Sequence, residues 1–297
     1  MSEKANRIIF GDNLPVLQAI PTASVQLIYI DPPFNTGKRR QHTEMKNTRS
    51  EDGDRTGFGG QLYSTTHLIT RAYEDNFSDY MTFLEPRLLE AYRVLAPTGS
   101  LYFHIDYREV HYCKVLLDAI FGRSSFLNEI IWAYDYGART TRKWPPKHDN
   151  ILLYAKDPQH YTFNCDAVER IPYMAPGLVG PEKAARGKRV TDTWWHTIVP
   201  TNGKEKTGYP TQKPVGILRR IVAASSNPGD TVLDFFAGSG STGAVCLALG
   251  RHFILVDNNP AALEIMQRRF ASAAGIEWAD YNPAAHADEP PCGESHP

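Results

Sequence analysis

The chain has 297 residues, 42% of them hydrophobic, and a formal net charge of −1, so it can bury a full core as one large domain or one with an insertion. It has no run of 18 apolar residues and no apolar N-terminal segment, so we expect a cytoplasmic protein with no membrane contact. The cysteines lack the paired spacing of a metal site and indicate no disulfide framework, so we expect reduced thiols and no metal. They are Cys113, Cys165, Cys246 and Cys292.

Residues 7–34 predict two strands around a short helix, and the second strand has an unusual ending. Its apolar run, Leu27–Ile30, stops at Asp31-Pro32-Pro33-Phe34. Proline fixes its φ angle and lacks an N–H, so the carbonyls of this turn are held rigidly. A planar heterocycle with an exocyclic amine would fit, because Phe34 could stack on the ring while Asp31 and the Pro32 carbonyl accept the amine hydrogens. The alternative is a strand-ending turn with an ordinary exposed aspartate.

The middle of the chain alternates regular and irregular segments. Residues 35–75 are polar and glycine-rich without a sustained hydrophobic period, which predicts a mobile loop. Apolar residues at three- and four-residue spacing then predict a helix over 79–95, followed by a strand over Ser100–Ile105 and another helix. Residues 126–208 are irregular and rich in aromatic residues, apart from a core strand predicted over Asn150–Tyr154. We interpret His104 and His148 as core or loop histidines rather than general bases.

A second informative block follows a helix predicted over 214–226. Thr231–Phe236 predicts a buried strand, and Gly238–Gly243 fits the pattern G-x-G-x-x-G before an apolar helix. Another strand, Phe253–Val256, leads to Asp257, nineteen residues after Gly238. Small residues let a ligand approach a helix N-terminus, and an acidic residue at this distance can receive ribose hydroxyls. The order predicts a site for a nucleoside cofactor, and the alternative is a glycine-rich structural turn.

The residues between this strand and its first glycine indicate which cofactor. A dinucleotide site normally places the glycines directly after the strand, with the pyrophosphate at the helix N-terminus. Here Asp234-Phe235-Phe236-Ala237 intervenes and brings a carboxylate and aromatic bulk. A negative group there disfavours pyrophosphate and favours a sulfonium or ammonium cation. The pattern therefore favours S-adenosylmethionine over NAD.

The chain resembles the bacterial DNA amino-methyltransferases of the β group, in which a D-P-P-F/Y motif precedes an F-x-G-x-G motif. The resemblance covers about residues 6–275, and further matching blocks are Gly11–Leu14, Arg93–Asp106 and Tyr209–Pro214. Asp-Pro-Pro-Phe, rather than Ser-Pro-Pro-Tyr, is more similar to the adenine-N6 members than to the cytosine-N4 members. This distinction is a tendency within the family.

The alternation of strands and helices predicts an α/β fold with a doubly wound, mostly parallel sheet, and the resemblance implies a class I, Rossmann-like methyltransferase. The catalytic core would comprise residues 1–134 and 209–278, with permuted motif order. Residues 135–208 would be mainly a target-recognition insertion, with its core strand near 150–155. The loop at 35–75 would close over DNA and cofactor, and the Pro-, Ala- and acid-rich tail, 279–297, is predicted to be disordered.

The implied activity is transfer of a methyl group from S-adenosylmethionine to adenine N6 at specific sites in duplex DNA, after base flipping. Cytosine N4 is the alternative, and RNA or a protein amide are further acceptors of the same chemistry. A nucleotide-dependent oxidoreductase or a non-catalytic binding module is a third hypothesis, in which Asp-Pro-Pro-Phe would have no role. The family pattern also implies a nucleoid-associated location and leaves open a cognate restriction endonuclease and a homodimer as partners.

The resemblance also assigns site residues. The catalytic residues would be Asp31, Pro32, Pro33 and Phe34. Asp257 would bind the ribose hydroxyls and Lys213 the methionine carboxylate, although Lys213 could instead be a solvated side chain. Asp12 would contact the ligand from the opposite side or, alternatively, cap a helix. The remaining cofactor residues would be Phe236, Ala237, Gly238, Ser239, Gly240, Ser241 and Thr242.

The net charge is low for a protein that binds DNA, but basic residues are clustered locally. Such clusters, mixed with Gly, Thr and aromatic residues, suit contact with phosphates, although each alone could be a solvated surface. The residues we expect to contact DNA are Lys38, Arg39, Arg40, Arg139, Arg142, Lys143 and Lys147.

Overall fold

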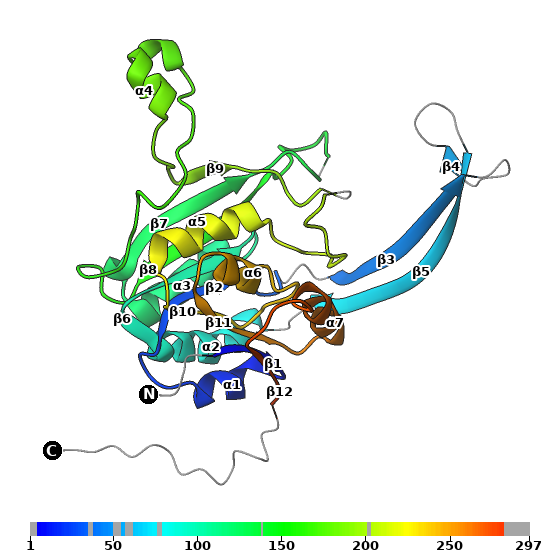
Figure 1. Cartoon of the computed structure of the whole chain (residues 1–297), viewed down its shortest axis with the longest axis horizontal. Helices are drawn as coiled ribbons and strands as arrows, with labels where there is room; N and C mark the ends of the chain where they lie inside the picture. Colours follow the sequence, from blue (N-terminus) through cyan, green and yellow to red (C-terminus); the bar gives the residue numbers. More distant parts are fainter. Residues whose placement is uncertain are drawn as a thin grey trace, which may run out of the picture.

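A computed structural model describes residues 5–34, 38–49, 55–56, 62–75, 79–137, 139–200 and 203–281. Its main feature is a mixed nine-stranded sheet with helices on both faces (Figure 1). Six strands form its parallel part: β1 (Asn6–Phe10), β2 (Val25–Ile30), β6 (Leu95–Ile105), β10 (Thr231–Asp234), β11 (His252–Asp257) and β12 (Ile276–Asp280). Within the described ranges, no helix is long and apolar enough to cross a membrane.

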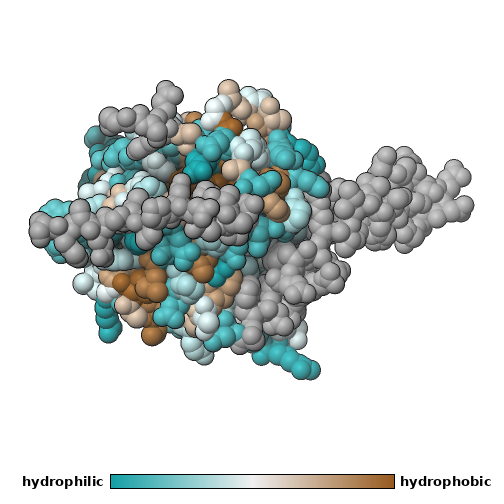
Figure 2. Space-filling model, turned by 90° about the horizontal axis from the view of Figure 1, so that it is seen from below, coloured by the Kyte–Doolittle hydropathy of each residue, from teal (hydrophilic) through white to brown (hydrophobic). Residues whose placement is uncertain are grey.

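Two layers of helices cover the sheet, each packed on its own hydrophobic cluster. The first layer contains α1 (Asn13–Ala19), α2 (Tyr80–Val94) and α3 (Val110–Phe121). The second contains α5 (Val215–Ser225), α6 (Ser241–Ala248) and α7 (Pro260–Arg269). The doubly wound sheet is therefore confirmed. Seen from below, from the side of the first layer, the described surface is mainly hydrophilic with separate hydrophobic groups (Figure 2).

The two motif strands are neighbours at the centre of the sheet. β2 and β10 pair in parallel, with Leu27 opposite Val232 and Ile28 opposite Leu233. β2 leads to α2 on one face, whereas β10 leads to α6 on the other, so the winding direction changes between them. Such a topological switch point opens a crevice at the carboxyl ends of the strands. The expected adjacency of the two motifs is therefore confirmed.

Three further strands extend the sheet beyond β6: β7 (Phe126–Ala133), β8 (His148–Ala155) and β9 (Thr193–Trp195). β8 confirms the core strand predicted near 150–155, and it is antiparallel to both β6 and β7. β7 and β9 were not expected, because Asn128 and Glu129 interrupt the apolar pattern of one and the other has three residues. A single turn, η1 (Arg123–Ser125), precedes β7, and the insertion also contains a short helix, α4 (Pro181–Arg186), and another single turn, η2 (Pro176–Leu178).

The segment predicted as a loop at 35–75 instead contains a three-stranded antiparallel arm that projects from the body (Figure 1). It consists of β3 (Lys38–Arg49), β4 (Arg55–Thr56) and β5 (Leu62–Asp75), with β5 in the middle. The prediction of a loop was wrong because it relied on hydrophobic periodicity. Backbone hydrogen bonds can pair long polar strands, here with Lys38 opposite Asp75 and Thr43 opposite Thr70. The mobility of this segment stays a prediction.

The boundary of the tail also needs correction. Disorder was predicted from Ala279, but β12 continues to Asp280 and pairs with β1, with Asp280 opposite Phe10. An edge strand with one neighbour needs little apolar sequence, which explains why composition misplaced its end. The rest of the predicted tail, 282–297, lies outside the described residues.

Candidate active site

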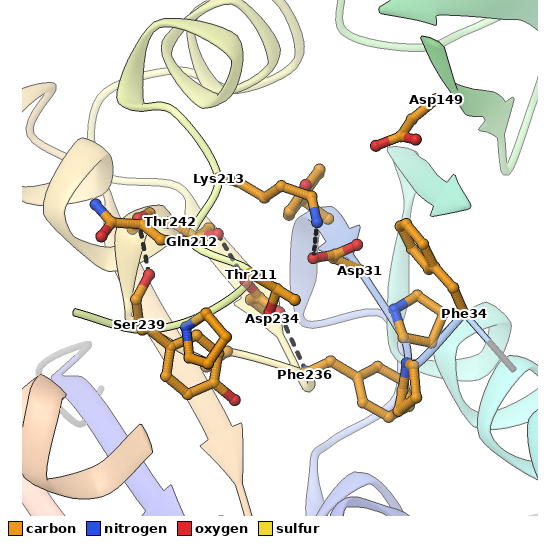
Figure 3. A pocket seen from close by; sticks show the side chains of 18 of the residues that line it. Asp31, Phe34, Asp149, Thr211, Gln212, Lys213, Asp234, Phe236, Ser239 and Thr242 are labelled. Atoms are coloured by element: carbon orange, nitrogen blue, oxygen red, sulfur yellow. Dashed lines mark hydrogen bonds and ion pairs between the residues drawn. The ribbon is translucent and has the colours of Figure 1, made fainter. Parts of the chain in front are cut away.

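A cavity of about 1050 Å³ lies at the carboxyl ends of β2 and β10 and contains both motif turns. Figure 3 shows Lys213 directed at Asp31, with Phe34 on one side and Asp234 and Phe236 on the other. The two turns therefore share one cavity, as the sequence predicts. The predicted site residues that line it are Asp12, Asp31, Pro32, Pro33, Phe34, Lys213, Phe236, Ala237, Gly238, Ser239, Ser241, Thr242 and Asp257.

The turn after β2 holds Asp31 with one oxygen paired and one free. Oδ2 forms an ion pair with the Lys213 ammonium. Oδ1 is buried and has no hydrogen-bond partner among the described residues. The Tyr80 hydroxyl donates a 2.5 Å hydrogen bond to the Pro33 carbonyl, which ties the turn to α2. A buried unpartnered acceptor is costly and is expected to find a donor when a ligand binds.

A buried polar network lies behind the Phe34 ring. The His104 ring centroid is 5.8 Å from that of Phe34. His104 Nδ1 lies 2.8 Å from the Tyr29 hydroxyl, and Nε2 lies 3.2 Å from Asp149 Oδ2. The Tyr134 hydroxyl donates to the other Asp149 oxygen at 3.0 Å. His104 thus links the Tyr29 hydroxyl to the Asp149 carboxylate through its two ring nitrogens.

Asp149 is a buried cavity residue that the sequence did not single out. Burial alone would raise the pKa of Asp149, but the hydrogen bond and the charge interaction with His104, the nearby Lys213 ammonium and the hydrogen bond from Tyr134 bring this pKa below its ordinary value. Asp149 as a residue is only 8% exposed and still lines the cavity. Its position directly before the predicted core strand was the one available signal, because its partners lie 15 and 45 residues away.

Two carboxyl groups fix the shape of the glycine turn. Asp234 accepts from the Phe236 N–H at 3.1 Å and the Thr242 hydroxyl at 2.6 Å. Asp257 accepts from the Gly238 N–H at 2.7 Å and the Asn259 N–H at 2.8 Å. These bonds leave lone pairs on Asp257 for ligand hydroxyls.

Two glycines of the turn, Gly238 and Gly240, have different structural roles. Gly238 has a φ of +50°, and a Cβ there would lie 2.9 Å from the Tyr209 ring. Gly240 has a φ of +70° and precedes α6, but its Cβ position faces Met266 and Phe270 at 2.9 Å. Gly240 does not line the cavity. It allows close packing of the turn against α7, which differs from the ligand contact predicted for it.

The charged groups give the cavity an excess of carboxylates. Asp31 is paired with Lys213, but Asp149, Asp234 and Asp257 have no Lys or Arg partner within the described chain. Burial, with smaller contributions from Asp31 and Asp257, raises the pKa of Asp234 to about 7 against its two hydrogen bonds. Burial also raises the pKa of Asp257. A cationic ligand would relieve the cost of ionising these groups.

Asp12 and Lys213 both make contacts within the protein. Asp12 caps α1 through the Leu14 N–H at 3.0 Å and pairs with Arg87 at 3.0 Å, while it also lines the cavity. Lys213 Nζ lies 5.0 Å from the Phe34 ring centroid in addition to its pair with Asp31. Both contacts place the Lys213 ammonium against the catalytic motif.

The basic residues predicted to contact DNA occupy different settings. Arg139, Arg142 and Lys143 are exposed and outside the cavity lining. Lys147 Nζ donates to the carbonyls of Asp135 and Gly137 at 2.7 and 3.2 Å, so it braces its own loop. Lys38, Arg39 and Arg40 open β3, and their side chains lie outside the described part of the structure.

Comparison with known proteins gives a consistent family. A protein-family model described as a DNA methylase matches residues 25–268. The type II methyltransferase M.HpaI of Haemophilus parainfluenzae is 32% identical over 268 residues, 90% of this chain and 74% of that protein. The DNA adenine methyltransferase YhdJ of Escherichia coli (strain K12) is 33% identical over 284 residues, 91% and 84% of the two chains.

Solved structures share the fold at lower identity. The M1.HpyAVI–SAM complex superposes with a TM-score of 0.57 at 19% identity, covering 89% of this chain and 98% of that one. The PvuII DNA methyltransferase, described as cytosine-N4-specific, has a TM-score of 0.58 at 15% identity and covers 94% and 98%. The match to the family model and the two curated relatives show that the chain belongs to the N6/N4 DNA methylase family and is an S-adenosylmethionine-dependent DNA methyltransferase.

Proposed function

We propose that this DNA methyltransferase methylates the exocyclic N6 of adenine at specific sites in duplex DNA, after the base has been flipped out of the helix. The observation that carries the proposal is the buried Asp31 Oδ1, which has no hydrogen-bond partner among the described residues and lines the same cavity as the glycine turn. An exocyclic amine is a hydrogen-bond donor that would satisfy this oxygen. The relative named as a DNA adenine methyltransferase supports adenine as the target.

The chemistry depends on making the amine more nucleophilic. Its lone pair is delocalised into the ring, so the free base attacks poorly. Asp31 Oδ1 and the Pro32 carbonyl would accept its two hydrogens and draw the nitrogen toward tetrahedral geometry, which concentrates the lone pair. The same oxygens would stabilise the positive charge that develops on nitrogen, because they would be hydrogen-bonded to the amine throughout the transfer. The Tyr80 hydroxyl, bonded to the Pro33 carbonyl, keeps the turn in position.

Lys213 assists by orienting the catalytic carboxylate. Its ammonium engages Asp31 Oδ2 and so leaves Oδ1 for the amine. An ammonium has three donors, so Lys213 can keep this bond and still bind the methionine carboxylate, the role expected of it from the sequence. A single side chain would then link occupancy of the cofactor site to the orientation of the catalytic residue.

The residues of the cavity fit S-adenosylmethionine, which supplies an electrophilic methyl group on a sulfonium. The excess of carboxylates suits its positive charge, and Asp257 retains lone pairs for ribose hydroxyls. The Gly238 turn gives the backbone close access to the ligand. Lys213 and the turn from Phe236 to Thr242 would hold the methionine part.

A base inside a duplex cannot reach this cavity, so flipping is required. Phe34 lines the cavity and His104 supports its ring from behind, so the flipped base would stack on a braced aromatic surface. Holding the amine against Asp31 in this way would supply much of the rate acceleration through orientation.

Expression in a host without DNA methylation tests the proposal. Genomic DNA is digested to nucleosides for mass spectrometry and also sequenced with base-resolution detection of methylation. We expect N6-methyladenine at one recurring sequence and none with Asp31→Ala. N4-methylcytosine would establish the alternative specificity, and full methylation by Asp31→Ala would refute the catalytic assignment.

A further inference from the structure

The loop between β7 and β8 carries a tryptophan that is almost completely exposed. Trp144 is 94% accessible, the same value as Met174 and above every other exposed large hydrophobic residue of the described chain. An indole normally buries its large apolar surface, so this exposure needs an explanation. Trp144 is also outside both hydrophobic clusters.

The loop stands at the mouth of the active-site cavity. Strand pairing places Ala133 opposite His148 and Ile105 opposite Asn150, so the loop lies at the edge where β6 ends. β6 is parallel to β2, and this is therefore the edge at which Asp31 lies. Figure 1 shows the connection, in green, continuing beyond the end of β7.

The two ends of the loop contribute directly to the cavity wall. Tyr136 and Gly137 line the cavity from one end, and Pro146 and His148 line it from the other. Trp144 is two residues before Pro146, which limits their Cα separation to about 7 Å. The indole is therefore adjacent to the opening through which a flipped base would enter.

The base of the loop is braced. The Tyr134 N–H donates to the Lys147 carbonyl at 2.9 Å. The Lys147 ammonium donates to the carbonyls of Asp135 and Gly137 across the loop, at 2.7 and 3.2 Å. Pro145 and Pro146 restrict the backbone directly after the tryptophan. These contacts hold the exposed indole on a firm support.

The charges around Trp144 identify the kind of partner. Arg139, Arg142 and Lys143 are exposed, and residues 139–147 contain no acidic side chain. An aromatic face amid cations suits nucleic acid, because the cations contact phosphates while the ring stacks on bases. A purely apolar protein interface would not require this charge.

We propose that Trp144 enters the DNA stack as the target base leaves it, and fills the gap beside the unpaired partner base. This inference rests on the proposed function, because it assumes a flipped base in duplex DNA. Flipping breaks stacking on both sides of the target, and proteins commonly compensate by inserting a side chain between bases. The indole replaces the lost stacking, while its basic neighbours hold the strand.

The test compares a matched duplex with one in which the target base stands opposite an abasic site. On the matched duplex we expect Trp144→Ala to lower kcat/KM by about 10- to 100-fold, from the loss of a base–aromatic stack. The target opposite an abasic site is already loosened and leaves no partner base to support. On this duplex we expect the kcat/KM of Trp144→Ala to lie within about threefold of that of the unmodified enzyme. Trp144→Phe, which can still stack, should recover most of the activity.

Trp278→Ala is the matched control. Trp278 is an exposed tryptophan of β12, at the opposite end of the sheet from β7. Its replacement by alanine should leave kcat/KM unchanged on both the matched and the abasic duplex. Fluorescence of 2-aminopurine at the target position provides a second measurement, and Trp144→Ala should lower the flipped population on the matched duplex. A loss that is no larger on the matched duplex than on the abasic one would overturn the inference. Failure of the proposed function is distinguishable, because the unmodified enzyme would then yield no N6-methyladenine.

Discussion

The proline turn after β2 and the glycine turn after β10 lie side by side but differ in how their carboxyl groups are satisfied. Both oxygens of Asp234 accept hydrogen bonds from the glycine turn, and the oxygens of Asp257 accept one from Gly238 in that turn and one from Asn259. In the proline turn, Asp31 Oδ1 has no partner in the described chain. The cofactor side is therefore preorganised without its ligand, whereas the catalytic side keeps an acceptor that is available to a substrate donor.

Asp31→Asn changes the proline turn, where the carboxyl group has an unpartnered oxygen, and should have the largest effect on catalysis. The amide preserves the size of the side chain, but it removes the charge that stabilises developing positive charge on nitrogen. We expect kcat to fall about 1000-fold in single-turnover methyl transfer, with the Kd for S-adenosylmethionine changed by no more than about threefold. A kcat within about tenfold of the unmodified enzyme would contradict the role of Asp31.

Gly238→Ala changes the glycine turn, which is preorganised for the cofactor. An alanine at this position would have to adopt a φ of +50°, which is unfavourable for a residue with a side chain. Its Cβ would also lie 2.9 Å from the buried Tyr209 ring. We expect S-adenosylmethionine to bind about 30-fold more weakly by calorimetry. Gly250→Ala is the control, since Gly250 has a φ of +69° and nothing within 4 Å of a Cβ. It should lower the Tm and leave the Kd unchanged, and equal losses of affinity in both variants would argue for general strain.

His104→Gln should affect the catalytic side indirectly, through the support of Phe34 and the orientation of Asp149. We expect about a tenfold lower kcat with little change in the KM for S-adenosylmethionine. The effect should be smaller when Phe34 is already alanine, because contacting residues are energetically coupled. Additive effects in this double-mutant cycle would show that His104 serves stability alone.

The pKa of Asp234, raised to about 7, predicts a smaller effect of pH on cofactor binding. The group is protonated below this pKa and ionised above it, and a cation favours the ionised form. The Kd for S-adenosylmethionine should therefore fall by about five- to tenfold as pH rises from about 6 to about 8. S-adenosylhomocysteine, which lacks the sulfonium charge, should show less dependence, and Asp234→Asn should remove the difference between the two ligands. Equal pH dependence for both would contradict this electrostatic role.

The parts of the site that could be predicted are contiguous in sequence. Each motif turn adjoins an apolar strand, so periodicity and residue type locate it directly. The network of Tyr29, His104, Tyr134 and Asp149 could not be predicted this way, because its members belong to no shared motif and are hydrogen-bonded to partners 15 to 75 residues distant in the sequence. Such pairings depend on which strands become neighbours.

The same reasoning explains the outcome for the fold. The parallel strands and the helices over them are strongly apolar, so their existence and order were predictable. The arm formed by β3 and β5 was not, since its strands are polar and are held by pairing with each other. β7 and β12 were missed or cut short for a related reason, because an edge or antiparallel strand with solvent on one side tolerates polar residues.

The pairing of β2 with β10 has a consequence for how such an enzyme can be assembled. The two strands are joined through hydrogen bonds of the sheet, and about 200 residues of chain separate them. Their carboxyl ends would meet equally well if the gene encoded the cofactor half before the catalytic half. Catalysis thus requires that the two strands be adjacent in the sheet, but it does not require a particular order of the two halves in the chain. New termini could therefore be opened and the old ones joined without moving a reacting atom.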